Sequence, residues 1–371
     1  MVLRISGVLS AGVLGLGLVA CGGGGGSSSA PPPVAVPPPP PPPPPPVSRD
    51  FSAVQAAVDT SVATNMAILV GDETGVLFAY EKGTFTTDQE VSIASASKMA
   101  FGLLIWDLVE SGDLSLADNP QDYIGFWTDM AGDGRSDITL DQLLGFTSGF
   151  NNPPGNAGCI GQGSVSLSDC VEQVYDDGLD TLAGSAFYYG PEHMQIAALM
   201  ATEATGKTNA ALLDERLMQP YGLSSMTRYP ALRGDNPRYS GNMVSTADDY
   251  ALWLTAILDG RLVSDRTGYL EDRTASVTFG SRPDGLDALD WHYGFGFWKE
   301  CDDLSYTSAC DDNPTISSPG AFGFTPWIDF DAGYWGIIAM EETVIGGQAA
   351  SVVSVELEQQ VQPLIEAALT P

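Results

Sequence analysis

The stretch SIASASKMAFGLL, from Ser92 to Leu104, contains the residue spacing that indicates most about the fold and chemistry of this chain. It places Lys98 three residues after Ser95, among small and apolar neighbours. If a helix begins at Ser95, the two side chains lie on one face, one turn apart. A serine hydroxyl is a poor nucleophile until a base removes its proton, and a buried lysine that loses its charge can do this. The spacing makes Ser95 a candidate nucleophile and Lys98 its candidate base, although a capping serine beside a surface lysine gives the same pattern.

The charge of the chain limits the classes of partner. The 371 residues include 47 Asp and Glu against 15 Lys and Arg, a formal net charge of −32. Phosphates would be repelled, so nucleic acid is excluded as a natural partner. Anionic substrates would be repelled too, unless the site supplies a local positive charge.

The first residues are expected to direct export. Arg4 precedes an apolar run that ends in Leu18-Val19-Ala20-Cys21, which resembles the lipobox of bacterial lipoproteins. That resemblance implies a signal peptide at 1–20 and lipid on Cys21; an ordinary signal peptide that ends near a cysteine is the alternative. Residues 21–48 are rich in Gly, Ser and Pro, and ten consecutive prolines would extend about 30 Å at ~3.1 Å per residue. We therefore expect residues 49–371 to form a domain that is tethered to a membrane of the bacterial envelope, in the periplasm or on the cell surface.

The remaining cysteines form two close pairs in the sequence. An oxidising compartment favours the disulfides Cys159–Cys170 and Cys301–Cys310, although four cysteines allow three connectivities. No pair has the CxxC spacing of a metal site, so no metal is expected.

Hydrophobic periodicity predicts helices and strands at both ends of the domain. Helical spacing marks residues 51–58, the segment after Ser95 up to Gly112, and 351–369. Strands are predicted at 66–80, as a hairpin, and at 295–298 and 325–342. The middle, 110–275, mixes helical patterns with polar loops. These elements predict an α/β protein of two lobes, in which the outer segments share one sheet.

Three other segments resemble known motifs but depart from them at required positions. Gly145–Gly149 has its serine one position too late for a nucleophile elbow. Gly206-Lys207-Thr208 lacks the first glycine of a phosphate loop, and the acidic segment 129–140 lacks key calcium ligands. His193 and His292 are the only histidines, so a Ser-His-Asp triad is possible but unsupported.

Five segments, in order, resemble the serine beta-lactamase and penicillin-binding-protein superfamily, in its class C-like branch with D,D-peptidases and esterases. The resemblance spans residues 51–369 and rests on 91–118, 138–150, 183–207, 236–258 and 318–330. It implies a beta-lactamase/transpeptidase-like fold, an antiparallel sheet flanked by helices plus a mainly helical lobe.

The resemblance also implies roles for particular residues. Ser95 matches the nucleophile, Lys98 its partner, and Tyr189 the tyrosine of the second motif, which would relay protons. The backbone N–H groups of Ser95 and Ala321 would form an oxyanion hole. Ser318 and Gly320 stand in the third motif, where substrate would bind. The mechanism needs no cofactor. Tyr189 could instead be a packing residue beside Tyr188.

The sequence departs from the family pattern in ways that bear on the substrate. Phe146 stands in place of a histidine, and Tyr189-Gly190-Pro191 lacks the usual asparagine. Ser318-Pro319-Gly320 lacks the Lys or His that holds a substrate carboxylate; an arginine could replace it, but the sequence does not place one.

These departures favour a hydrolase of small esters or amides. A D,D-peptidase or beta-lactamase is the alternative, and a non-catalytic binding lipoprotein is a further one. Five aromatic residues are candidates for an apolar acyl pocket or, more commonly, for the core: Trp106, Phe150, Trp291, Tyr293 and Trp327.

Overall fold

The computed structural model describes residues 49–151, 158–283, 285–286, 289–301, 305–312 and 314–370. The predicted signal peptide, Cys21 and the tether up to Ser48 lie outside the described residues. Within the described part of the chain, none of the helices is both long and apolar enough to cross a bilayer.

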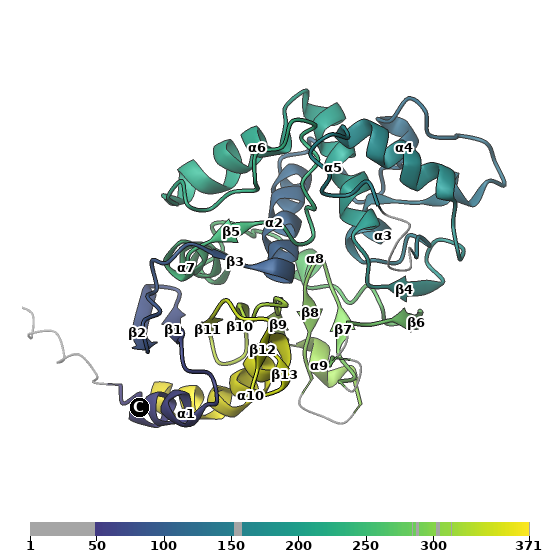
Figure 1. The fold of residues 1–371 in the computed structure, drawn as a ribbon. Helices are drawn as coiled ribbons and strands as arrows, with labels where there is room; N and C mark the ends of the chain where they lie inside the picture. Colours follow the sequence, from purple (N-terminus) through teal and green to yellow (C-terminus); the bar gives the residue numbers. More distant parts are fainter. Residues whose placement is uncertain are drawn as a thin grey trace, which may run out of the picture. The chain divides into compact units, whose positions relative to one another are not determined.

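The described residues form a seven-stranded antiparallel sheet in the order β2-β1-β11-β10-β9-β8-β7 (Figure 1). Its first two strands are a hairpin near the start of the domain, and the others come from the last third. The outer segments of the chain therefore share one sheet, as predicted. The strands are β1 Met66–Asp72, β2 Gly75–Lys82, β7 His292–Tyr293, β8 Trp298–Lys299, β9 Thr315–Ser317, β10 Thr325–Asp329 and β11 Tyr334–Ala339.

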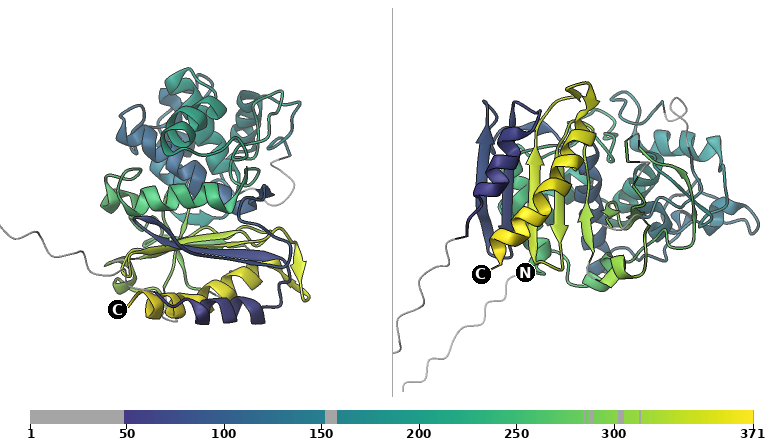
Figure 2. Two further views of the ribbon diagram at one scale, coloured as in Figure 1. Left: turned by 90° about the vertical axis from the view of Figure 1, so that its left-hand side faces the viewer. Right: turned by 90° about the horizontal axis from the view of Figure 1, so that it is seen from below.

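Strand β1 shows why this sheet needs a cover on both faces. Every residue from Met66 to Gly71 is buried. Met66, Ile68 and Val70 pack with residues of α1 (Ser52–Thr60) and α10 (Ala350–Leu369). The alternate residues Ala67 and Leu69 join the larger core on the other face, which contains α7 (Ala247–Leu258). In Figure 2, α1 and α10 lie side by side below the sheet and α7 lies above it.

A mainly helical lobe holds the middle of the chain (Figure 1). Short strand pairs, β3 with β5 and β4 with β6, connect it to the rest of the domain. The helices of this lobe include α3 Leu140–Leu144, α4 Leu167–Asp177, α5 Glu192–Thr205, α6 Asn209–Leu212 and a π-helical turn Leu213–Met218. The other short elements of the domain are α8 Arg266–Tyr269, α9 Ala309–Asp312, β3 Val91–Ser92, β4 Ala186–Tyr188, β5 Val244–Ser245, β6 Thr278–Ser281, β12 Val344–Ile345 and β13 Gln348–Ala349.

Helix α2 (Ser97–Glu110) runs between the sheet and the helical lobe (Figure 1). Its residues from Ser97 to Trp106 are all buried, so the helix has neighbours on every side. A Cβ atom at Gly102 would lie 2.4 Å from the carbonyl oxygen of Phe295, so only glycine permits this close approach. Lys98, in the first turn of α2, and Ser95, in the turn just before α2, therefore lie between the sheet and the helical lobe.

Most predicted elements are confirmed, and one is wrong. The opening helix, the hairpin and the closing helix form where expected, and Gly112 follows the end of α2 with a φ of +78°. The predicted strand 295–298 is largely a turn instead. Gly294 N–H donates to the carbonyl of Phe297 at 2.9 Å, and Gly296 has a φ of +84°, outside the strand region. Only Trp298–Lys299 pairs as a strand there.

Candidate active site

Ser95 and Lys98 are in direct contact. Ser95 lies in the 3₁₀ turn Ala94–Ala96, and Lys98 lies in the first turn of α2. Lys98 Nζ is 2.9 Å from Ser95 Oγ and donates to the carbonyl oxygen of Ser240 at 2.7 Å. Lys98 is only 5 % exposed, and it has no carboxylate partner among the described residues. Burial, helped by the charge of Arg238, lowers the pKa of Lys98 to about 7.

The turn that carries Ser95 has an unusual backbone. Ala94, one residue before Ser95, has a φ of +45°, which side-chain-bearing residues rarely adopt. Ser97 holds this conformation, since its Oγ donates to the Ala94 carbonyl at 2.6 Å and accepts the N–H of Met243 at 3.1 Å. Strained residues cluster at functional sites, where the surrounding structure fixes them.

Tyr189 joins the same site from the helical lobe. It follows β4 and precedes α5, and its ring stacks on Trp298 with the ring centroids 5.5 Å apart. Lys98 Nζ lies 4.5 Å from the centroid of the Tyr189 ring. Burial raises the pKa of Tyr189 to about 12, while the Ser95 side chain lowers it in part. The phenol is therefore protonated at neutral pH.

The third-motif segment lies against the nucleophile turn. Ser318 Oγ donates to the carbonyl oxygen of Ser95 at 3.0 Å. A Cβ at Gly320 would lie 2.2 Å from the Ile93 carbonyl oxygen, so glycine is required for this approach. Ala321 follows at an exposed turn, and among the described residues its N–H has no hydrogen-bond acceptor. These contacts place Ser318 and Gly320 against the turn that carries Ser95, and Ala321 is the next residue along the chain.

A pocket of about 270 Å³ opens beside Ser95. The five aromatic candidates named above do not line it; all are buried, so they are core residues. A larger pocket of about 550 Å³ is lined by residues 133–135 and 178–182. Neither Ser95, Lys98 nor Tyr189 lines it, so it is separate from the candidate active site. The pocket at Ser95 is lined by Ala94, Ser95, Lys98, Tyr189, Gly190, Pro191, Arg238, Ser240 and Gly241.

Arg238 is a site residue that the sequence did not single out. It belongs to the turn 238–242, between the helical lobe and β5. The third motif lacks the Lys or His that would bind a substrate carboxylate. Arg238 brings a cation to the pocket from a different segment of the chain. Its place within one of the five matching segments, two residues before Ser240, was the available signal.

Ser148, the serine of the segment Gly145–Gly149, is not accessible. It is fully buried, and its Oγ lies 2.8 Å from His193 Nδ1. His193 Nε2 lies 2.9 Å from the carbonyl oxygen of Tyr188, which assigns the ring proton to Nε2 and lets Ser148 donate to Nδ1. Burial lowers the pKa of His193 to about 4, so the ring is neutral. The His193 ring contacts the backbone of Tyr188, whereas Ser148 does not line the pocket at Ser95.

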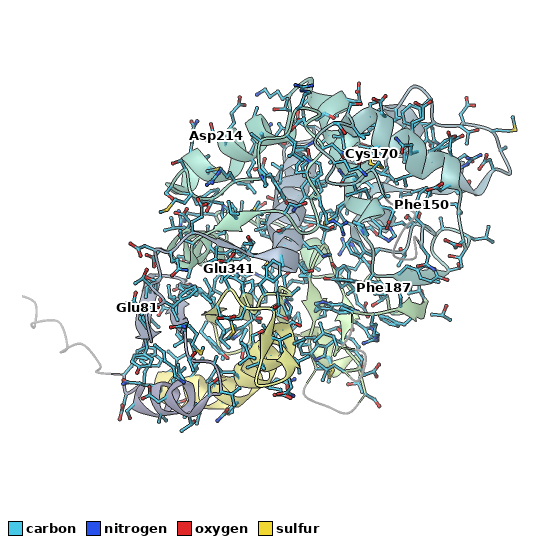
Figure 3. All side chains as sticks on the ribbon, viewed as in Figure 1. Glu81, Phe150, Cys170, Phe187, Asp214 and Glu341 are labelled. Atoms are coloured by element: carbon cyan, nitrogen blue, oxygen red, sulfur yellow. A yellow bond between two sulfur atoms is a disulfide. The ribbon has the colours of Figure 1, made fainter. Side chains whose placement is uncertain are left out.

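Both predicted disulfides, Cys159–Cys170 and Cys301–Cys310, are present, and Cys170 lies on α4 in the helical lobe (Figure 3). The side chain of Asp133, in the acidic segment 129–140, is bonded to Arg135. In the described ranges, no three His, Cys, Asp or Glu side chains converge as metal ligands.

The sequence matches the family described as Beta-lactamase over residues 52–346. This chain belongs to the beta-lactamase family. Its predicted fold class is thereby confirmed, an α/β beta-lactamase/transpeptidase-like fold with an antiparallel sheet flanked by helices. None of the curated proteins matches the chain.

Solved structures with this fold come from several kinds of enzyme. A beta-lactamase-like protein from Bacteroides dorei DSM 17855 is 26% identical, with a TM-score of 0.71, over 86% of this chain and 99% of that one. EstCE1, a hydrolase with promiscuous acyltransferase activity, is 16% identical, with a TM-score of 0.65, over 86% and 97%. D-amino acid amidase from Ochrobactrum anthropi SV3 is 15% identical, with a TM-score of 0.63, over 86% and 100%. At identities this low, the last two show the fold alone.

Proposed function

We propose that this protein is a serine hydrolase that cleaves an ester or a small amide through an acyl-enzyme on Ser95. The contact of 2.9 Å between Ser95 Oγ and Lys98 Nζ carries the proposal. A lysine that is buried, has no carboxylate partner among the described residues and has a pKa near 7 is largely neutral slightly above that pH. Its lone pair then accepts the Ser95 proton while one N–H remains on the Ser240 carbonyl.

The first half of the reaction forms the acyl-enzyme. Ser95 Oγ attacks the carbonyl carbon as its proton passes to Lys98. The oxyanion that develops binds the N–H groups of Ser95 and Ala321, which are donors worth about 3–4 kcal/mol each at such sites. The intermediate then collapses, and the leaving group takes a proton from Lys98 through the Tyr189 hydroxyl. A pKa of about 12 makes Tyr189 a proton relay and not the initial base.

The second half regenerates the enzyme. Water attacks the acyl carbonyl and loses a proton to Lys98, and the acid leaves as Ser95 recovers its proton. The mechanism uses side chains and backbone groups of this chain and calls on no cofactor.

The nucleophile can be tested by intact-mass labelling of the protein with a fluorophosphonate, together with turnover of p-nitrophenyl acetate. We expect one adduct and ester turnover in the wild type and in Ser148→Ala, and neither in Ser95→Ala. Ser148→Ala is the matched control, because it removes another serine hydroxyl that lies beside a basic side chain. Labelling that persists in Ser95→Ala would show that the nucleophile is misassigned. A folded wild type that never labels would support a binding lipoprotein instead.

A D,D-peptidase or beta-lactamase is the second candidate, and Arg238 favours it. The sequence argued against such substrates because the third motif lacks a cation for their carboxylate. Arg238 lines the pocket and offers one. A stable penicillin adduct on Ser95 would support a peptidase, and penicillin turnover would support a beta-lactamase.

We also propose that a lipid on Cys21 holds the domain at a membrane of the bacterial envelope. The two disulfides are consistent with an oxidising compartment. Incorporation of an alkyne-bearing fatty acid in wild type but not in Cys21→Ser would support the anchor, and equal incorporation would refute it.

A further inference from the structure

Arg238 differs from most described arginines of this acidic chain in that it has no carboxylate partner among the described residues. Carboxylates outnumber Lys and Arg by 47 to 15, and most described arginines have one as a partner. Among the described residues, the Arg238 side chain forms neither an ion pair nor a hydrogen bond, and Arg233 shares this feature. The arginines with Asp or Glu partners are Arg49, Arg135, Arg216, Arg228, Arg261, Arg273 and Arg282.

The backbone of Arg238 is held in a tight turn. Its N–H donates to the side-chain oxygen of Asn242 at 3.0 Å, and its carbonyl accepts the N–H groups of Gly241 and Asn242 at 3.0 and 2.9 Å. The same turn carries Ser240, whose carbonyl oxygen accepts the hydrogen bond from Lys98. The position of Arg238 is therefore tied to that of the candidate base.

Buried polar contacts support the turn from the helical lobe. Gln195 Nε2 donates to the side-chain oxygen of Asn236 at 2.6 Å and to the Pro237 carbonyl at 2.9 Å. Asn236 in turn donates to the carbonyl of Cys159 at 2.8 Å. Because these groups are buried and bonded, the turn presents Arg238 from a fixed backbone, which lowers the entropic cost of using it.

Arg238 lies at the same pocket as the reacting groups. It lines the same pocket as Ser95, Lys98 and Tyr189, and its charge acts on Lys98 and also on Glu192, the first residue of α5. A guanidinium group offers a planar fork of donors that matches a carboxylate. In a molecule with this net charge, an arginine without a carboxylate partner in the pocket supplies the local attraction that an anionic substrate requires.

We infer that Arg238 is a specificity-determining residue, which selects ester or amide substrates that carry a carboxylate on their acyl or leaving part. This inference rests on the proposed hydrolase function and narrows its substrate class. The carboxylate would form charge-assisted hydrogen bonds with the guanidinium while Ser95 attacks the carbonyl carbon.

Two matched ester pairs test the inference. On the acyl side, p-nitrophenyl hydrogen glutarate is compared with its neutral methyl ester, p-nitrophenyl methyl glutarate. On the leaving-group side, 4-acetoxybenzoate is compared with methyl 4-acetoxybenzoate, with release of the phenol as the readout. The assays are run at pH 9, where Lys98 is neutral, so that a changed Lys98 charge does not enter the comparison.

The expected result is a preference that depends on Arg238. In at least one pair, Arg238→Gln lowers kcat/KM for the carboxylate by about tenfold and changes the neutral ester by less than about twofold, the size of a partly exposed charged hydrogen bond. Arg238→Lys retains part of the preference, because it keeps the charge but loses the fork. Arg233→Gln, the matched control, changes neither ester. Rising salt weakens the preference in the wild type and in the variants that keep a cation at position 238, and not in Arg238→Gln.

Two different failures are distinguishable. If the neutral esters are cleaved in a Ser95-dependent way but Arg238→Gln leaves the ratio unchanged in both pairs, the inference is wrong and the proposed function stands. If the wild type cleaves no ester and the fluorophosphonate does not label Ser95, the proposed function fails and the inference fails with it.

Discussion

Lys98 is hydrogen-bonded to the same tight turn that carries Arg238. Lys98 Nζ donates at 2.7 Å to the carbonyl oxygen of Ser240, two residues after Arg238. The two positive charges share one pocket, and Lys98 is buried while Arg238 is exposed. Burial first, and Arg238 second, lower the pKa of Lys98 to about 7. The turn thus connects the strength of the base to the residue that we propose selects the substrate.

This connection predicts a pH profile for the neutral ester. The proposed base is unprotonated Lys98, so kcat/KM rises with pH and levels off above an apparent pKa of about 7. Arg238→Gln removes a nearby positive charge, which stabilises protonated Lys98, so the acid limb moves to higher pH. Arg233→Gln leaves the limb in place. The profile is measured with p-nitrophenyl acetate between pH 5.5 and 9.5, and an acid limb that does not move in Arg238→Gln would disprove the coupling.

The protonated state of Tyr189 predicts the effect of Tyr189→Phe. With a pKa of about 12, the phenol relays protons and is not the initial base. We expect kcat to fall by about 10²-fold, within the range for a positioned proton-transfer group, while the acid limb stays near pH 7. Tyr188→Phe, which removes the neighbouring hydroxyl, is the control and keeps nearly full activity. Loss of the acid limb in Tyr189→Phe would contradict Lys98 as the base.

The buried carboxyl group of Glu192 is expected to make the unfolding free energy of the domain depend on pH. Both of its carboxyl oxygens are buried with no hydrogen-bond partner in the described residues, and burial raises its pKa from 4.5 to about 7. The folded state therefore holds the proton more tightly than the unfolded state. Its contribution to stability is full below pH 4.5 and is lost as pH rises to about 7, about 3 kcal/mol in all at ~1.4 kcal/mol per unit.

The variant Glu192→Gln removes this titration. We expect it to be more stable than wild type by up to about 3 kcal/mol at pH 8.5 and nearly equal to it at pH 4.5, measured by urea unfolding. Glu203→Gln, at an exposed position on the same helix, should follow the wild type at both pH values. Equal stability of Glu192→Gln and wild type at pH 8.5 would show that the Glu192 carboxylate is solvated or paired.

The disulfide Cys159–Cys170 is expected to stabilise the domain more than Cys301–Cys310 does. Both close short loops, of 11 and 9 residues, so each limits the unfolded chain by a similar amount, about 2–3 kcal/mol. Cys159 and Cys170 are also buried in the core, and the Cys159 carbonyl holds Asn236. The double variant Cys159→Ala with Cys170→Ala should lose at least 1 kcal/mol more, on the order of a buried contact, than the matching variant of the second pair. Equal losses of unfolding free energy would contradict this.

Several features followed from short stretches of the sequence. Helical and strand periods predicted the opening helix, the hairpin, α2 and the closing helix, because these patterns repeat within a few residues. The spacing of Ser95 and Lys98 predicted their contact for the same reason. The predicted strand at 295–298 failed because Gly296 adopts a positive φ in a turn against α2, a conformation that apolar composition does not reveal.

The sequence by itself determined the family, the order of elements, the Ser95–Lys98 pair and the two close cysteine pairs, since each is encoded by neighbouring residues or by motif order. Only the tertiary structure decided the chemistry of the site. The pKa of Lys98 is lowered because the side chain is buried and lies near the charge of Arg238, which is far away in the sequence. Ser148 is not accessible to a substrate because it is fully buried. Arg238 lies at the pocket because the turn that it shares with Ser240 packs there. Desolvation and charge–charge interactions depend on residues far apart in the chain, so they become visible only when folding brings those residues together.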